Sequence, residues 1–294
     1  MQADPEFEPG DTAIGRPRLP AGQPIELPGR GTTFFREIAG PPDAPVVFLL
    51  HGWTVSAALN WFPVYEPLAE FARVISIDHR GHGRGIRSRD RFRLTDAADD
   101  VVALADQLGV SRFVVAGYSM GGSIAQLVAF RHPSRVIGMV LAATWAKQPR
   151  HHRQTRLMRA AGPVGRGTRV LSPERQYAMF HWGYMRASGR EADTGPPWFA
   201  EEVQAGSVPM ILEAGGEIAR FDNREWIGGI DVPTGIVITT RDSMVGPDLQ
   251  HRLAALIPHA ALRSVPIDHD GCITEPKVFV PPFLDLVRHA AGVR

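Results

Sequence analysis

The most informative stretch of the chain is Arg112–Gly122, which reads RFVVAGYSMGG. A β-branched run leads into the pattern G-x-S-x-G, and a helical pattern follows at once. Strand, sharp turn and helix form the context of a nucleophile elbow, which lifts a serine hydroxyl clear of a sheet. Gly117 and Gly121 flank Ser119 and leave no side chain where backbones crowd. We therefore expect Ser119 to be a nucleophile and favour this over a Gly-rich turn with an incidental serine.

Apolar runs alternate with helical patterns on both sides of this stretch. A run that is apolar on both faces is typical of a central parallel strand. Such alternation predicts right-handed crossovers and an α/β fold with a doubly wound, mainly parallel sheet. The expected strands are Val46–Leu50, Val74–Ile77, the run before Ser119, Val136–Ala142, Thr234–Thr240 and Leu262–Ile267, preceded by a hairpin of Pro24–Leu27 and Thr32–Ile38. The expected helices include Phe62–Phe71, one capped by Thr95, Pro173–Arg186, Val208–Phe221, Leu249–Ile257 and Pro281–Ala291.

The chain divides into a core and an insertion. Residues 1–22 show no periodicity and predict a loose N-terminal arm. Residues 23–144 and 232–294 carry the alternation and form the core. The strand signal disappears over residues 145–231, where helical patterns predict an inserted helical cap. An insertion that leaves the carboxyl end of a parallel strand stands over the edge where ligands bind, so we expect this cap to act as a lid.

Composition limits the classes of function. The chain has 294 residues, 44% of them hydrophobic and 21% charged, as in soluble globular proteins. A net charge of +1 gives no reason to expect a nucleic-acid partner. The single cysteine, Cys272, excludes an intramolecular disulfide and a Cys-rich zinc site, and a buried inert thiol is favoured over a metal ligand. With no apolar run of membrane-spanning length and no apolar signal region, we expect a cytoplasmic protein without a transmembrane segment.

A triad of nucleophile, base and acid is expected at the carboxyl edge of the sheet. A serine hydroxyl needs a base to remove its proton, and the base needs an acid to orient it. Asp242 and His269 each come just past an expected strand, downstream of the elbow. The order serine, acid, histidine is that of a hydrolase with a nucleophile elbow. We predict Ser119 as nucleophile, His269 as general base and Asp242 as its orienting acid.

Other residues compete for two of these roles. Asp248 is the alternative acid, although it lies further on, towards a helix. Asp268 and Asp270 flank the histidine, but neighbours on an extended chain point to opposite sides. Three earlier histidines also lie at expected strand ends: His51, His79 and His82.

The oxyanion hole and the substrate contacts are expected at the same edge. Two N–H donors must point at the tetrahedral oxygen. Met120, directly after the nucleophile, should give one, and Trp53 should give the other, with Gly52 allowing a close approach. The side chains expected to contact substrate are Trp53, Tyr118, Trp145, Trp182 and Val245.

Taken together, these motifs resemble those of the α/β-hydrolase superfamily, and most closely its esterases, lactonases and cofactor-free perhydrolases. The resemblance covers roughly residues 24–144 and 232–290. Its motifs are His51-Gly52-Trp53, the run Asp78–Gly83, Gly117–Gly122, Arg241–Pro247 and His269. The family usually has glycine before this histidine, whereas this chain has Asp268, which changes the local polarity.

The resemblance implies a serine hydrolase of carboxylic esters or lactones that works through an acyl-enzyme and needs no metal or organic cofactor. Acyltransferases, perhydrolases and C–C bond hydrolases use the same triad and remain alternatives. A non-catalytic ligand receptor on a hydrolase scaffold is a further alternative. Epoxide hydrolases and haloalkane dehalogenases share the architecture, but their nucleophile is aspartate, so Ser119 argues against both.

The predicted cap suggests the class of substrate. Its aromatic and methionine side chains suit an apolar roof, and we expect a small-molecule ester with a medium-chain or bulky apolar acyl group. Lys147 to Arg169 is a basic run with no acid before Glu174. We favour a solvated face for this run over an anionic substrate, and expect no peripheral membrane contact. Five glycines of the cap could serve as hinges: Gly162, Gly165, Gly167, Gly215 and Gly216.

Overall fold

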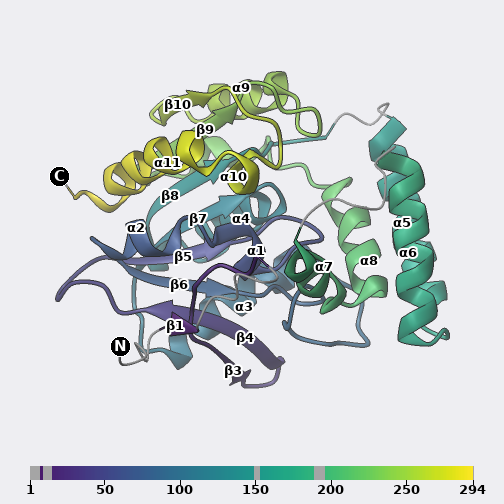
Figure 1. Cartoon of the computed structure of the whole chain (residues 1–294). Helices are drawn as coiled ribbons and strands as arrows, with labels where there is room; N and C mark the ends of the chain where they lie inside the picture. Colours follow the sequence, from purple (N-terminus) through teal and green to yellow (C-terminus); the bar gives the residue numbers. More distant parts are fainter. Residues whose placement is uncertain (1–6, 9–14, 149–152, 189–195, 294) are drawn as a thin grey trace.

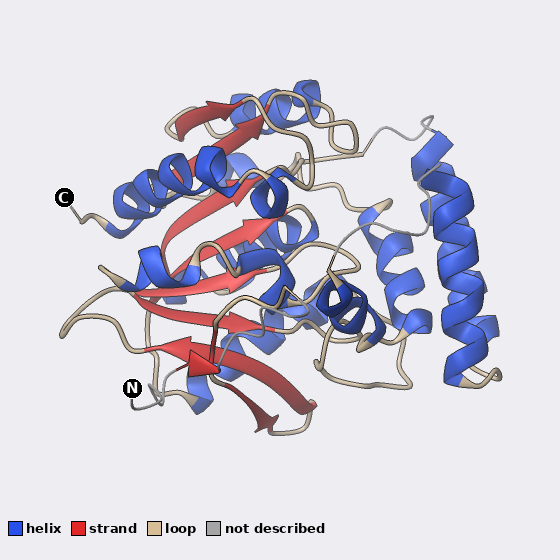
Figure 2. Cartoon of the chain, in the orientation of Figure 1, coloured by secondary structure: helices blue, strands red, loops and turns tan. Residues whose placement is uncertain are grey.

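The computed structural model describes residues 7–8, 15–148, 153–188 and 196–293. Its main feature is an eight-stranded sheet in the order β10-β9-β8-β7-β5-β6-β4-β3. Figure 2 draws its strands in red, with helices in blue around them. A separate short pair joins β1 to β2. The strands are β1 (Phe7–Glu8), β2 (Leu19–Pro20), β3 (Gly22–Leu27), β4 (Gly31–Ile38), β5 (Val46–Leu50), β6 (Arg73–Ile77), β7 (Phe113–Tyr118), β8 (Val136–Ala142), β9 (Thr234–Thr239) and β10 (Ala261–Val265).

The sheet is mainly parallel. Strands β5 to β10 pair in parallel, and β3 and β4 add an antiparallel edge next to β6. The carboxyl ends of the parallel strands therefore meet at one edge, as expected for a doubly wound α/β fold. The predicted hairpin is also confirmed, since the backbone N–H of Arg30 donates to the carbonyl of Leu27 at 2.9 Å between β3 and β4.

Helices cover both faces of this sheet. In β5, Phe48 and Leu50 point into one apolar core with α3 and α4, whereas Val47 and Leu49 point into another with α1, α2 and α11. Burial on both faces explains why these strands are continuous apolar runs. The helices of the core are α1 (Ala57–Trp61), α2 (Tyr65–Ala69), α3 (Leu94–Gln107), α4 (Met120–Arg131), α9 (Pro247–Leu256), α10 (Gly271–Thr274) and α11 (Pro276–Ala291), with 3-10 turns η1 (Pro133–Arg135) and η2 (Ile227–Gly229).

Several predicted helix boundaries are wrong, and proline accounts for two of them. Only α2 lies within the helix expected over residues 62–71, whereas α1 precedes that range and was not expected. Pro63, between the two, has no N–H to continue α1. Helix α11 begins at Pro276, five residues before the prediction, and contains Pro281 within it. Thr95 is not an N-cap: Arg93 holds that position and α3 begins at Leu94.

The prediction of a loose N-terminal arm is wrong for residues 15–22. Leu19 is only 2% exposed and packs into the core shared by α1 and α11. The guanidinium of Arg36 donates to the carbonyl of Pro20, and Arg16 forms an ion pair with Glu201. This part of the arm is therefore fixed to the body of the protein, and residues 1–6 and 9–14 lie outside the described residues.

Four helices lie between β8 and β9, beyond the carboxyl ends of the parallel strands (Figure 1). Met210, Ala214 and Ile218 of α8 join the apolar core, and α5 packs along α8. Two of the glycines expected to be hinges allow this packing, because a Cβ on Gly216 would lie 3.4 Å from the Cα of Gly162. The four helices are α5 (Arg153–Thr168), α6 (Pro173–Ser188), α7 (Pro197–Gln204) and α8 (Val208–Ile218), of which α5 and α7 were not among the helices named from the sequence. Their role as a separate, mobile lid stays a prediction.

The basic run is only partly a solvated face. Lys147 pairs with Asp222 at 2.5 Å, and Arg169 donates to the carboxylate of Glu213 at 3.2 Å. Arg156 and Arg166 are exposed. The prediction is therefore wrong for the two paired cations, and Arg150 lies outside the described residues. No helix in the described ranges is both long and apolar enough to cross a membrane.

Candidate active site

Ser119 lies in a strained turn between β7 and α4. Its backbone angles are φ 54° and ψ −116°, in a region that non-glycine residues rarely adopt. The neighbouring glycines are required by space. A Cβ on Gly117 would lie 2.2 Å from the carbonyl oxygen of Gly121, and one on Gly121 would lie 2.0 Å from that of Leu50. The sequence pattern is thus explained by crowding of the β7–α4 turn against β5.

Three side chains from three strand ends meet at this turn. The Oγ of Ser119 is 3.0 Å from Nε2 of His269. The Nδ1 of the same ring is 2.8 Å from Oδ2 of Asp242. Asp242 follows β9 and His269 follows β10, so the parallel sheet brings them to Ser119 from 123 and 150 residues away in sequence. The structure therefore places the three predicted residues in hydrogen-bonding order.

The carboxylate of Asp242 is held on all sides. Its Oδ1 accepts the backbone N–H of Met244 at 2.9 Å and of Val245 at 2.7 Å. Its Oδ2 accepts the hydroxyl of Thr239 at 2.8 Å as well as the imidazole. These bonds fix the carboxylate towards His269. The alternative acid, Asp248, lies in the first turn of α9 and makes no contact with the imidazole among the described residues.

Asp268 has a supporting position that the sequence did not predict. Its Oδ1 accepts the backbone N–H of Ser243 at 2.8 Å and that of His269 at 2.7 Å. Burial opposes ionisation of this carboxyl, but the bonds from Ser243 and His269 prevail and lower its pKa. The ionised Asp268 thus joins the loop of Asp242 to the loop of His269. Tyr118 adds a second support by donating its hydroxyl to the His269 carbonyl at 2.9 Å.

The predicted oxyanion loop is held by buried polar groups. The N–H of Gly52 donates to Oδ1 of Asn60 at 2.7 Å, and Nδ1 of His51 lies 2.7 Å from the Gly52 carbonyl. In the described part of the chain, the backbone N–H groups of Trp53 and Met120 have no acceptor, so both donors remain available. Asn60 was missed, although an asparagine inside the apolar pattern of α1 was a signal that could have found it.

The three other histidines form a buried cluster that does not reach Ser119. The ring of His51 lies 4.4 Å from that of His79 and 5.6 Å from that of His82. Burial lowers the pKa of His51 to about 3 and that of His82 to about 4, and it also lowers the pKa of His79. Their position disfavours them as alternative bases. Among the described residues, no group of three or more His, Cys, Asp or Glu side chains is arranged to hold a metal ion.

The residues expected to contact substrate are mostly buried. Trp53 is partly buried and donates its indole N–H to the Ile211 carbonyl of α8 at 2.7 Å. Tyr118, Trp145 and Val245 are each at most 3% exposed. The side chain of Trp182 lies outside the described residues. Contact of these residues with a substrate stays a prediction.

Comparison with known proteins identifies the family of the chain. The family model for the alpha/beta hydrolase fold matches residues 45–276. A putative carbamate hydrolase, RutD, from Variovorax paradoxus strain S110 is 28% identical over 261 residues, which cover 87% of this chain and 96% of that protein.

Solved structures agree on the fold. A hydrolase from Pseudomonas aeruginosa PA01 superposes with a TM-score of 0.74 at 21% identity, covering 90% of this chain and 98% of that one. The enol-lactonase from Burkholderia xenovorans LB400 gives a TM-score of 0.71 at 21% identity, covering 90% of this chain and 99% of that one. With a family model that spans most of its length, the chain belongs to the α/β-hydrolase family and is an enzyme of the hydrolase class.

Proposed function

We propose that the protein is a serine hydrolase that cleaves carboxylic esters or lactones of apolar acyl groups through an acyl-enzyme on Ser119. The observation that carries this proposal is the unbroken chain of hydrogen-bond distances from Ser119 through His269 to Asp242, 3.0 Å and 2.8 Å long. This is the order of groups that activates a serine hydroxyl.

In the first half of the reaction, Nε2 of His269 takes the proton of Ser119 as Oγ attacks the carbonyl carbon. Asp242, bonded to Nδ1, orients the ring and stabilises the imidazolium that forms. The carbonyl oxygen becomes an oxyanion and accepts hydrogen bonds from the backbone N–H groups of Trp53 and Met120. The C–O bond to the leaving alcohol then breaks, and the imidazolium returns its proton to that alcohol.

In the second half, water replaces the alcohol. His269 takes a proton from the water, whose oxygen attacks the acyl carbon. The tetrahedral intermediate uses the same two N–H donors. Breaking the bond to Oγ releases the carboxylic acid, and the proton on the imidazolium returns to Ser119.

The preference for apolar acyl groups is supported by the side chains around the elbow. Trp53 packs its ring against α8, where a Cβ on Gly215 would lie 2.7 Å from it. Met120 and Val245, directly after the nucleophile and close after the acid, are buried and apolar. An acyl chain placed here would lose water contact against apolar atoms, which favours larger groups.

Covalent labelling tests the proposal. A fluorophosphonate probe should label the wild-type chain on Ser119, and a panel of p-nitrophenyl esters should be hydrolysed. Ser119→Ala should lose labelling and at least about a thousandfold in kcat, because no nucleophile remains. Ser123→Ala is the matched control, since Ser123 lies one turn later in α4, is buried, and its hydroxyl has no partner among the described residues. Equal loss in both variants, or full activity in Ser119→Ala, would contradict the role of Ser119.

Carbamates are a second candidate substrate class. The support is the similarity to the putative carbamate hydrolase, which extends over nearly the whole of both chains. A carbamate has a carbonyl that Ser119 could attack by the same steps, giving a carbamoyl-enzyme. Matched p-nitrophenyl carbamates and esters, compared by kcat/KM, decide between the two classes.

Further arms of the same assay address acyl transfer, perhydrolysis, C–C bond cleavage and simple binding. Added alcohol should trap the acyl-enzyme as a new ester if the enzyme is a transferase, and added hydrogen peroxide should give a peracid if it is a perhydrolase. A β-diketone panel detects C–C bond hydrolysis. Tight binding of ester products without any labelling of Ser119 would favour a receptor.

A further inference from the structure

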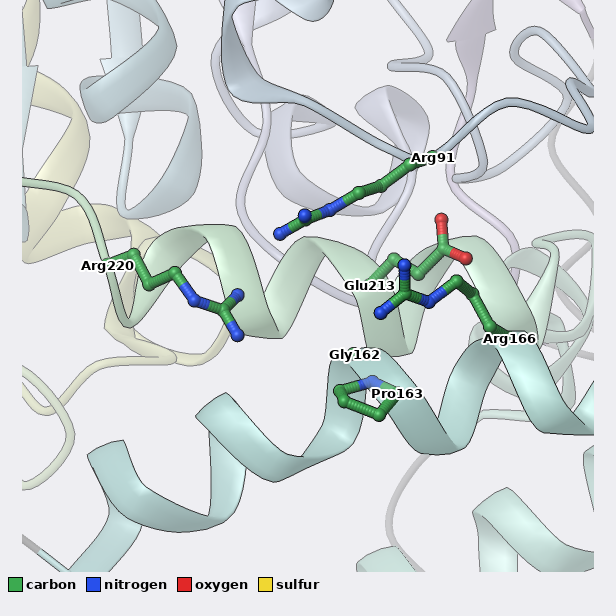
Figure 3. Close-up of a pocket in the computed structure, with 6 residues that line it drawn as sticks. All are labelled: Arg91, Gly162, Pro163, Arg166, Glu213 and Arg220. Carbon is green, nitrogen blue, oxygen red and sulfur yellow. The ribbon is translucent and has the colours of Figure 1, made fainter.

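A cavity of about 210 Å³ lies between α5, α8 and the loop that precedes α3. Figure 3 shows the residues around it. Its lining combines three guanidinium groups with one carboxylate and a small apolar wall. The lining residues are Arg91, Gly162, Pro163, Arg166, Glu213 and Arg220.

The carboxylate in this lining, that of Glu213, already has hydrogen-bond donors from the protein. Glu213, whose side chain is 1% exposed, accepts the backbone N–H of Phe92 at 2.8 Å and the guanidinium of Arg169 at 3.2 Å. Glu217 is a second carboxylate beside the cavity. It accepts a hydrogen bond from the guanidinium of Arg91 at 2.7 Å and lies 3.9 Å from that of Arg220. Four arginines thus face two carboxylates, which leaves an excess of positive charge around the cavity.

Arg220 is fixed in place by a defect in α5. Pro163 has no backbone N–H, so it leaves the carbonyl of Arg159, one turn earlier, without its helical donor. Nη2 of Arg220 reaches that carbonyl at 3.4 Å, and Nη1 bonds the Gly216 carbonyl at 2.8 Å. The guanidinium is therefore already oriented beside the cavity. A ligand that binds it avoids most of the entropy cost of ordering this side chain.

Arg166 has neither a hydrogen-bond partner nor an ion-pair partner for its side chain in the described ranges of the chain. It lies on α5, across the cavity from Arg91, and the two side chains extend towards the same gap over α8 (Figure 3). A guanidinium offers a planar fork of donors that matches the oxygens of phosphate and carboxylate. The unmatched charge of this cavity is thus of the kind that recognises an oxyanion.

We propose that this cavity binds a small oxyanion with two or more negative charges, such as inorganic phosphate or a short di- or tricarboxylate. The volume of about 210 Å³ equals that of about seven water-sized groups at about 30 Å³ each, which suits a small polyanion. The cavity shares no residue with the triad or with the predicted oxyanion donors. The bound anion bridges α5, α8 and the loop of Arg91, and so it braces the cap helices against the core.

Calorimetric titration of the full chain with inorganic phosphate and, separately, with citrate tests the proposal, at an ionic strength held constant with sodium chloride. The wild type should bind at least one of the two saturably and with one site. Arg166→Gln should weaken that binding about tenfold or more, since it removes a charge-assisted hydrogen bond. Arg166→Lys should have an affinity between those of the wild type and Arg166→Gln, because lysine keeps the charge and loses the planar fork of donors.

Arg156→Gln is the matched control. Arg156 is an exposed arginine of the same helix, but it does not line the cavity. Arg156→Gln removes one positive charge from α5, as Arg166→Gln does. Because only long-range charge is lost, its affinity for phosphate or citrate should stay within about twofold of the wild-type value. Ser119→Ala should bind like wild type, which keeps this test independent of the proposed hydrolysis. Absence of saturable binding of both probes to the wild type, or equal weakening in Arg156→Gln and Arg166→Gln, would overturn the proposal.

Discussion

Ser119 shows how backbone strain is held by its neighbours. Its positive φ costs about 1–3 kcal/mol, and the surrounding structure must supply that free energy. The strain persists because β5, β7 and α4 approach so closely at Gly117 and Gly121 that only hydrogen atoms fit between them. The position of Ser119 is thus set by packing of the backbone around it and does not depend on contacts of its side chain.

Gly121→Ala should therefore remove both stability and activity. The new Cβ would lie 2.0 Å from the carbonyl oxygen of Leu50, so the turn must shift. We expect the free energy of unfolding to fall by about 2–4 kcal/mol, with loss of probe labelling at Ser119. Gly246→Ala is the control, because no atom lies within 4 Å of its Cβ position. Urea denaturation of both variants gives the comparison, and a Gly121→Ala variant as stable as the wild type would show that the turn can relax.

Asp242→Asn should keep the fold and lose most turnover. The asparagine amide cannot stabilise the imidazolium of His269 as a carboxylate does, and we expect kcat to fall by about a hundredfold to ten-thousandfold. Asp248→Asn should keep nearly full activity, since Asp248 lies in α9 away from the imidazole. Steady-state kinetics on one p-nitrophenyl ester decides the assignment, and reversed phenotypes would make Asp248 the acid.

The meeting of Ser119, Asp242 and His269 could be predicted because each of the three follows a recognisable local pattern. Ser119 lies in its elbow, and the other two lie just past apolar strands, where a parallel sheet must bring them together. Asp268 and Asn60 could not be predicted in the same way. Their roles depend on bonds to the backbones of Ser243 and Gly52, whose loop conformations carry no sequence pattern.

At the scale of the element, sequence periodicity located strands better than helices. Strands β5 to β9 are buried on both faces, so their limits in the structure differ from the prediction by at most one residue. Helix limits depend on proline: α1 ends at Trp61, two residues before Pro63, and yet Pro281 lies within α11. Helix α7 was missed because its short pattern gives little periodic signal, and its position depends on tertiary contacts.

Those contacts fix α7 to the core. Glu202 is 2% exposed and accepts the guanidinium of Arg84 at 3.0 Å. It also accepts the hydroxyl of Ser56, the residue that caps α1. Since α1 follows the loop of Trp53, these contacts join α7 to the predicted oxyanion loop. If α5, α6 and α8 move in solution, we expect them to move relative to α7, which these contacts hold.

Helix α8 gives an expectation for substrate size. Met210, Ala214 and Ile218 present an apolar face to the core near Trp53, and charge lies on other sides of the helix. Esters with medium-chain or bulky apolar acyl groups should have a higher kcat/KM than acetate, by about tenfold for a few added methylenes. A chain-length series of p-nitrophenyl esters measures this at low and high ionic strength. Fastest turnover of acetate would contradict the apolar surroundings, and a steep loss with salt would indicate an anionic substrate.

At the scale of the whole molecule, the sheet separates two apolar cores, and polar groups are buried near its carboxyl edge. The cluster of His51, His79 and His82 lies among them, at the ends of β5 and β6. Two ring nitrogens of His79 and one of His82 have no hydrogen-bond partner among the described residues. These rings are therefore stable only in their neutral form, which links the stability of the fold to pH.

The direction of that link follows from the protons bound in each state. Unfolded histidines have a pKa near 6.5, whereas burial lowers the pKa of His51 to about 3 and that of His82 to about 4 in the fold. Between these values the unfolded chain binds protons that the folded chain does not. The free energy of unfolding should thus be nearly constant from pH 8 to 7 and fall below pH 6.5, by up to about 1.4 kcal/mol per pH unit for each histidine.

Urea denaturation at pH 7, 6 and 5 measures this slope, and His82→Gln tests its origin. Removing one of three buried histidines should reduce the slope below pH 6.5 by about a third, whatever the variant's stability at pH 7. His251→Gln, an exposed histidine of α9, should keep the wild-type slope. Asp78, whose pKa is raised by burial, acts in the opposite direction at lower pH, but it is present in every variant and cancels in the comparison. An unchanged slope in His82→Gln would show that acid sensitivity arises outside this cluster.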